Sequence, residues 1–232
     1  MAGMGAFTWL VMKEIIDMIS GFILRKCIAN PDQNKERIQM AVDSIWQIIY
    51  FSMSVAWGYS FLSVSRWLPS FLGGKHPRGA LEATYESLLF IDTPPGCHCY
   101  ILFNYGYHVL DFFNHLKGEK KEDWREVFLQ HLVVLMMYPA FFLSNLMGIG
   151  VLVSWIHDIA DIFFNLCRLL NMVGPSFLYQ ASYALLIIVW TYTRSLVLPY
   201  FIYKIITEAR YPEKVSHFQP LIWLQVILLL FI

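Results

Sequence analysis

Apolar residues gather along the chain into long runs that are separated by short polar or breaker-rich connections. Most of these runs have about the 20 residues that an α-helix needs to cross a hydrocarbon core of about 30 Å. Five of them predict helices, at 41–65, 98–116, 127–146, 148–170 and 181–205. We therefore expect an all-α, polytopic membrane protein.

Two further apolar segments lie near the ends. Lys13, Glu14 and Asp17 interrupt residues 7–24, which leaves open a polar-faced span or a helix in the membrane interface. The run 221–232 has 12 residues, about 18 Å of helix, so it is an interfacial stub or the beginning of a longer helix. The five central runs and these two end segments together predict about six to seven transmembrane helices. We expect an N-terminal helix and loop at 1–34 and a membrane domain at 35–232.

Composition supports a membrane protein and argues against a soluble domain, a nucleic-acid partner and a disulfide scaffold. Hydrophobic residues make up 57% of the chain and charged residues 15%, which excludes a simple soluble domain. Because 17 basic residues balance 17 acidic ones, we expect no nucleic-acid partner. Four cysteines are too few for a disulfide scaffold, and we expect free thiols.

Charges outside the apolar runs indicate an orientation. The segment 117–126 carries eight charges in ten residues and predicts a solvated loop. If every segment spans, nine Lys and Arg fall on one side of the membrane and six on the other. The positive-inside rule then favours an outside amino terminus.

Ionisable side chains inside the spans carry the functional signal, because each costs several kcal/mol in hydrocarbon unless it faces a partner or a cavity. His108, Asp111 and His115 follow at i, i+3 and i+7 and form one stripe. Gln130 and His131 lie about one turn into the next span.

The span 148–170 has the densest polar face, and the span after it carries a cation deep in an apolar run. His157, Asp161, Asn165 and Arg168 share one face, with Asp158 at its edge, and Trp190 and Arg194 lie one turn apart in 181–205. Arg194 must meet an anion, a carbonyl or water. Pro139 and Pro199 each remove a helical hydrogen bond and predict kinks.

Histidine, aspartate and arginine on separate helices are typical of a metal site, a proton relay, an acid/base or nucleophile site, or a satisfied polar core. No two histidines are four residues apart, as membrane di-iron sites require, so we expect no metal and no bound cofactor. The other three alternatives stay open.

Two stretches of sequence resemble a known family. W-R-E-V-F-L-Q-H-L-V-V-L (124–135) and G-I-G-V-L-V-S-W-I-H-D-I-A-D-I-F-F-N-L-C-R-L-L-N (148–171) are similar to the longevity-assurance (Lag) motif of the TLC domain family, which includes the ceramide synthases. N-Y-G-Y-H-V-L-D (104–111) precedes them and W-T-Y-T-R (190–194) follows, in the family's order. The resemblance covers roughly residues 35–225.

The resemblance implies a bundle of about six core helices around a lipid-accessible cavity. In the ceramide synthases this cavity transfers an acyl group from acyl-CoA, the co-substrate, to a sphingoid base. Carried over, the catalytic residues are His131, His157, Asp158 and Asp161, and Gln130, His108, Asp111, Trp190 and Arg194 are expected to bind lipid. The main departure is Gln130, which stands where the family has the first histidine of an adjacent pair.

Three hypotheses follow for this chain. The first is a lipid N-acyltransferase, and the second is a non-catalytic lipid-binding protein or accessory subunit of a larger membrane complex. A proton-coupled transporter is the third and weakest, because no inverted repeat is visible. We expect membrane lipid and long-chain acyl groups as partners, and a homodimer stays open. The resemblance suggests the endoplasmic reticulum, with a mitochondrial membrane as the alternative.

Overall fold

The computed structural model describes residues 2–28, 31–65, 68, 70–75, 96–118, 124–143 and 147–208. Within these ranges, the side chains of 2–6, 27, 70 and 204–208 are left out of the description. Every regular element in the described part of the chain is a helix, so the all-α prediction is confirmed. The last apolar run, 221–232, lies outside the described residues.

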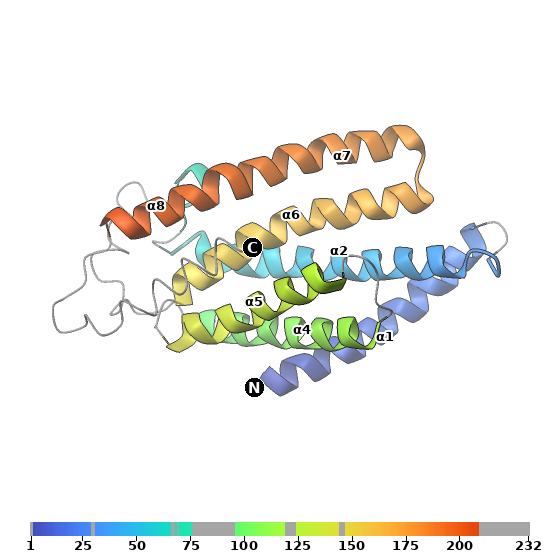
Figure 1. Ribbon diagram of the computed structural model, residues 1–232, viewed down its shortest axis with the longest axis horizontal. Coiled ribbons are helices and arrows are strands. Elements are labelled where there is room, and N and C mark those ends of the chain that lie inside the picture. The colour runs from blue at the N-terminus through green and yellow to red at the C-terminus, as the bar shows by residue number, and fades with distance from the viewer. Residues whose placement is uncertain are drawn as a thin grey trace. The chain divides into compact units, whose positions relative to one another are not determined.

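Nine helical elements follow one another in these ranges (Figure 1). They are α1 (Ala2–Cys27), α2 (Lys35–Leu62), the 3-10 turn η1 (Ser70–Leu72), α4 (Cys97–Lys117), α5 (Trp124–Leu143), α6 (Met147–Val173), α7 (Ser176–Trp190), the π-helix η2 (Thr191–Val197) and α8 (Leu198–Glu208). The chain forms two compact units. Unit 1 comprises residues 1–9, 58–153 and 201–232, and unit 2 comprises residues 10–57 and 154–200.

In unit 2, helices α2 and α6 run antiparallel and side by side (Figure 1). Hydrogen bonds between them fix the register: Arg37 donates to the Met172 carbonyl through both Nε (2.7 Å) and Nη2, Ser54 Oγ to Asp158 (2.5 Å) and Trp155 Nε1 to the Val55 carbonyl (3.0 Å). The end of α1 completes the apolar core, whose buried members are Leu24, Ile38, Ala41, Val42 and Met172.

In unit 1, helices α4 and α5 form an antiparallel pair (Figure 1). Aromatic contacts join them along their length, from His98 with Phe142 at one end to His115 with Trp124 at the other. The left-handed backbone of Gly96 (φ 99°) precedes α4, and Gly118 ends it with hydrogen bonds from its N–H to two carbonyls of the last turn.

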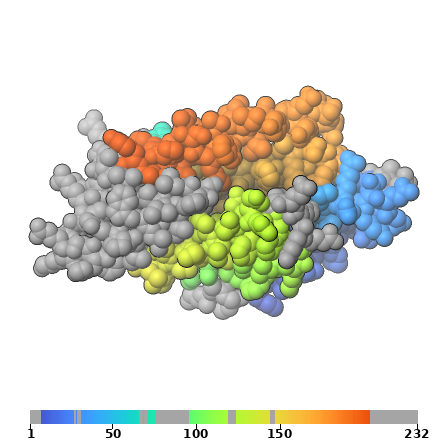
Figure 2. Space-filling model, in the orientation of Figure 1, coloured from blue at the N-terminus to red at the C-terminus, as the bar shows by residue number. Residues whose placement is uncertain are grey.

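Three helical segments are long and apolar enough to cross a membrane by length and composition: Trp124–Leu143, Met147–Val173 and Ser176–Tyr203. They match the runs predicted at 127–146, 148–170 and 181–205. Figure 2 shows much of the length of α7, in orange, at the surface. Its large apolar side chains are exposed there, as lipid-facing residues are. Helices α1 and α4 contain the predicted runs 7–24 and 98–116, and α2 contains residues 41–62 of the run 41–65. The total of six to seven spans stays a prediction.

The third of these segments changes its hydrogen-bond register before Pro199. In η2 the N–H of Leu198 donates to the carbonyl of Thr193, five residues back rather than four. Proline lacks an N–H and its ring collides with the carbonyl four residues earlier, which a wider turn relieves. The Thr193 hydroxyl donates to the carbonyls of Val189 (2.9 Å) and Trp190 (3.2 Å), where the register changes. Pro139, by contrast, lies inside a continuous α5.

Candidate functional site

The α4–α5 pair carries three histidines and a carboxylate on its facing sides, which we call the histidine cluster (His108, Asp111, His115 and His131). His131 Nδ1 lies 3.9 Å from Asp111 Oδ2, and both side chains are half-buried. Positions 108, 111 and 115 share one face of α4, so the stripe predicted from the sequence faces α5. The structure therefore brings together two residues that sequence reasoning assigned to different groups, catalytic and lipid-binding.

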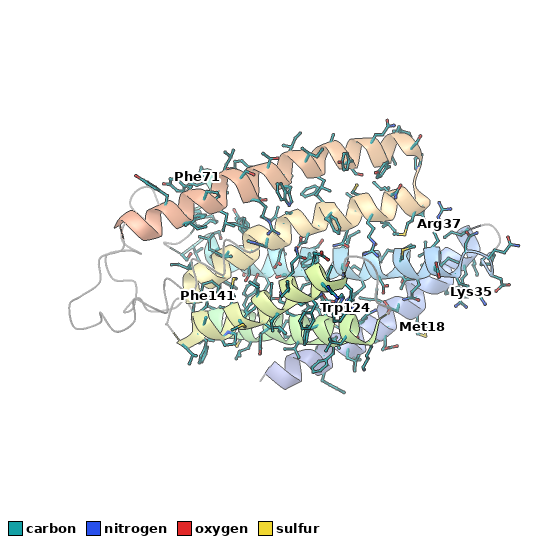
Figure 3. The ribbon with its side chains drawn as sticks, viewed as in Figure 1. Met18, Lys35, Arg37, Phe71, Trp124 and Phe141 are labelled. Carbon is teal, nitrogen blue, oxygen red and sulfur yellow. The ribbon has the colours of Figure 1, made fainter. Side chains whose placement is uncertain are left out.

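His115 adds a second imidazole beside His131. Their ring centroids are 5.2 Å apart, and His115 stacks on Trp124, labelled in Figure 3, at 5.3 Å and 19°. His115 Nε2 lies 3.1 Å from the Trp124 carbonyl oxygen. Because a carbonyl only accepts, Nε2 carries the hydrogen, and in a neutral ring Nδ1 is then an acceptor.

His108 closes the cluster one turn before Asp111. Its ring lies 5.3 Å from Tyr138 of α5 and 5.3 Å from Tyr107 of its own helix. Tyr138 and His131, seven residues apart, share one face of α5, since both contact rings of α4. His108 therefore has a mainly aromatic environment, unlike His131 with its carboxylate.

The cluster lies at a definite depth along the helix pair. Trp124 begins α5, and His115 lies in the last turn of α4. His131 follows Trp124 by seven residues, about 10 Å along the helix axis. Because tryptophan is enriched at membrane interfaces, we expect His115 at the interface and His131 about two helical turns deeper.

Unit 2 holds a second polar group, which we call the carboxylate network (Ser54, Asp158, Asp161 and Arg194). Asp158 is buried on α6 and accepts the hydrogen bond from Ser54. Asp161 Oδ1 lies 3.9 Å from Arg194 Nη2, whose side chain is only 14% exposed. The prediction that Arg194 must meet an anion, a carbonyl or water is confirmed, and the anion is Asp161.

The remaining predicted site residues are Gln130, Trp190 and His157. Gln130 is exposed on α5, and Trp190 is 51% exposed, so its ring is on the surface while Arg194 points inward. His157 is half-buried on α6 in unit 2, whereas His131 belongs to unit 1. The assignment of catalytic roles to His131, His157, Asp158 and Asp161 together stays a prediction.

Metal binding has no ready donor set in the described ranges. No group of three or more His, Cys, Asp or Glu side chains there is arranged to hold a metal ion. Of the cysteines whose side chains are described, Cys97, Cys99 and Cys167 are free thiols. Independently of this, the imidazoles of the histidine cluster can transfer protons and act as nucleophiles.

Sequence reasoning missed some of these contacts. Ser54 was not singled out, although it is a hydroxyl in an apolar run, and Trp124 was noticed only as part of a motif. His115 was placed in the polar stripe but was not assigned to the site. The signal for His115 was present, since it shares a helix face with His108 and Asp111.

Helices long and apolar enough to cross a membrane, with paired ionisable side chains turned inward, define an all-α integral membrane protein that keeps polar groups inside its fold. Residues 41–232 match the TLC domain, and the chain belongs to this family. The resemblance described from the Lag-like stretches is thereby confirmed at the level of the family.

Individual relatives are similar over most of this chain. Human ceramide synthase 4 is 22% identical over 172 residues, which cover 72% of this chain and 41% of the relative. Human ceramide synthase 5 is 19% identical over 160 residues, covering 69% and 38%, and mouse ceramide synthase 4 is 23% identical over 159 residues, covering 68% and 37%. The chain spans about two fifths of the length of these curated relatives.

Proposed function

We propose that this TLC domain protein transfers a fatty acyl group from acyl-CoA to the amino group of a sphingoid base or a similar long-chain amine. The observation that carries the proposal is the contact between His131 Nδ1 and Asp111 Oδ2 at 3.9 Å on two apolar helices. Similarity to ceramide synthases 4 and 5 supports the substrate class.

The contact with Asp111 favours one tautomer of His131. A carboxylate beside Nδ1 keeps the hydrogen on that nitrogen, which leaves the lone pair on Nε2. Nε2 is then the atom that accepts a proton from the substrate ammonium. The freed amine attacks the thioester carbonyl, the C–N bond forms and the C–S bond breaks. The thiolate leaves and takes up the second proton of the attacking nitrogen to give CoA, so each turnover releases one net proton, the one held by His131.

His115 is suited to receive that proton. In its neutral tautomer Nδ1 is an acceptor, and its ring lies next to that of His131 at the interfacial end of the helix pair. Contributions of His157, Asp158, Asp161 and Arg194 to the same reaction remain predictions from the sequence.

The experiment is an acyl-transfer assay on the purified full chain in lipid nanodiscs. Acyl-CoAs of several chain lengths are paired with several long-chain bases, and both CoA release and amide product are measured. We expect turnover that His131→Ala abolishes and Asp111→Asn lowers by about 10²-fold or more, the usual share of a positioned base. His98→Ala is the matched control, because His98 is an exposed histidine at the other end of α4. No turnover with any pair would refute the proposal.

A second candidate function is lipid binding without catalysis, which Gln130 favours. An amide side chain can donate and accept hydrogen bonds, but it is neither a base nor a nucleophile at neutral pH. Under this hypothesis His131→Ala lowers the thermal stability or the lipid content of the purified protein, and wild type gives no product. The same assay therefore separates the two functions.

The proposed compartment follows from the proposed substrates. A sphingoid base acyltransferase of this family is expected in the endoplasmic reticulum. A non-catalytic subunit of a larger complex would also fit a mitochondrial membrane. A fluorescent fusion imaged with markers of both compartments decides between them.

A further inference from the structure

Helix α1 turns its polar side chains inward, toward α2. Lys13 Nζ lies 2.5 Å from Asp17 Oδ2 on its own helix and 3.4 Å from Asp43 Oδ1 on α2. Ser20 is buried and donates its hydroxyl hydrogen to the Ile16 carbonyl at 2.6 Å. Both charged groups on this side of α1 therefore have partners within unit 2.

The opposite side of α1 is apolar and uncovered, and we call it the outer face. Its members are 40–69% exposed: Phe7, Leu10, Val11, Ile15, Met18, Ile19, Phe22 and Ile23. In Figure 3 the labelled Met18 lies on the side of α1 away from α2. A helix that is apolar outside and polar inside is suited to a membrane and not to water. Its 26 residues extend over about 39 Å, which is enough to cross by length alone, although α1 is not among the three segments that are both long and apolar enough.

Glu14 interrupts the outer face near the middle of α1. It is exposed and lies one turn from Leu10 and Val11 on one side and from Met18 on the other. Within the described residues, the ion pairs of α1 involve Lys13 and Asp17 but not Glu14. A carboxylate on a lipid-facing surface near the middle of a membrane-spanning helix is costly unless a cation or a polar partner meets it.

Two of the candidate occupants of the outer face provide no cation or polar partner for the Glu14 carboxylate. Lipid acyl chains cover the apolar members and leave the carboxylate of Glu14 in hydrocarbon. A second copy that packs α1 against α1 around position 14 brings Glu14 against its own equivalent. The helix's own exposed cations, Arg25 and Lys26, lie 11 and 12 residues further on, about 16–18 Å along the axis.

We propose that the outer face of α1 binds a transmembrane helix of another protein, one that places a Lys or Arg level with Glu14. Apolar side chains of the partner helix pack along Leu10, Val11, Ile15 and Met18, and its cation pairs with the carboxylate. This surface is independent of the proposed acyl transfer, because none of these residues belongs to the histidine cluster.

The test measures association in phosphatidylcholine vesicles by energy transfer between the labelled full chain and synthetic transmembrane helices. The helices are Leu/Ala sequences that are identical except for one central residue, which is Lys, Leu or Glu. We expect the Lys helix to associate about tenfold more tightly than the Leu helix, since interhelical polar contacts contribute about 1–2 kcal/mol in such peptides. Glu14→Gln should remove this preference, and Glu14→Lys should transfer it to the Glu helix.

Glu126→Gln is the matched control, because Glu126 is an exposed carboxylate in the first turn of α5. It should leave the preference unchanged. Retention of the Lys preference in Glu14→Gln would overturn the proposal, and so would equal association of all three helices. Self-association of the wild-type chain that Glu14→Gln abolishes would also overturn it, in favour of a second copy. Absence of any association would leave lipid as the occupant.

Discussion

Replacing Gly150 by alanine tests the close approach of α5 and α6. A Cβ at position 150 would lie 2.7 Å from Phe141 Cδ2 and 3.1 Å from Phe141 Cβ, well inside ordinary contact distance. The Phe141 ring, labelled in Figure 3, is only 1% exposed, so it has little room to move. Overpacking of this kind costs about 1–3 kcal/mol. The gain in helix propensity from Gly to Ala, about 1 kcal/mol in a helix interior, is reduced because Gly150 lies in the first turn of α6.

The expected net loss is about 1–2 kcal/mol, or a midpoint lowered by about 2–8 °C for a chain of this size. The assay is thermal unfolding in one detergent at one scan rate, because membrane proteins often unfold irreversibly. Gly21→Ala is the control, since its new Cβ meets only Val42 Cγ2, at 3.8 Å, and should not destabilise. Phe141→Leu combined with Gly150→Ala should lose less than the sum of the two single changes. Equal midpoints for the two alanine variants would refute the reasoning.

Two further predictions concern the carboxylate network and are checked by the same thermal measurement. Ser54→Ala removes the hydroxyl that donates to the buried Asp158 and should cost about 1–3 kcal/mol, whereas Ser44→Ala, a buried serine that bonds within its own helix turn, should cost less. Asp161→Asn and Arg194→Gln should each destabilise, and the double variant should recover part of the loss. The coupling energy between the two substitutions should fall near the lower end of about 0.5–3 kcal/mol, because the Asp161 side chain is 37% exposed. Strictly additive losses of stability would contradict the ion pair.

Helix positions are well predicted by apolar runs, because burial in lipid requires about 20 apolar residues whatever the neighbours are. The runs 98–116 and 148–170 became Cys97–Lys117 and Met147–Val173. The run 41–65 was less accurate at its start, since α2 begins at Lys35. The first turns of α2 are polar, and a search for apolar residues does not detect the part of a helix that extends beyond the apolar run.

Contacts between helices were harder to predict than helices. Spacing along one helix shows which residues share a face, but it does not show which helix that face meets. The sequence therefore placed Asp161 and Arg194 in the spans without pairing them, and it did not identify Ser54 as the partner of Asp158. The π-helix was also missed, because Pro199 predicted a kink and the wider turn is one of several ways to accommodate a proline.

The two carboxylate contacts differ in what they can do chemically. Arginine stays protonated in proteins, so the contact of Asp161 with Arg194 neutralises charge and transfers no proton. Histidine exchanges its proton readily, so the contact of Asp111 with His131 can support a base in the proposed acyl transfer. Two similar substitutions should therefore have different effects. Asp111→Asn should lower acyl transfer with little change in the unfolding midpoint, whereas Asp161→Asn should mainly lower the unfolding midpoint. The reverse pattern would indicate that the reaction takes place in unit 2.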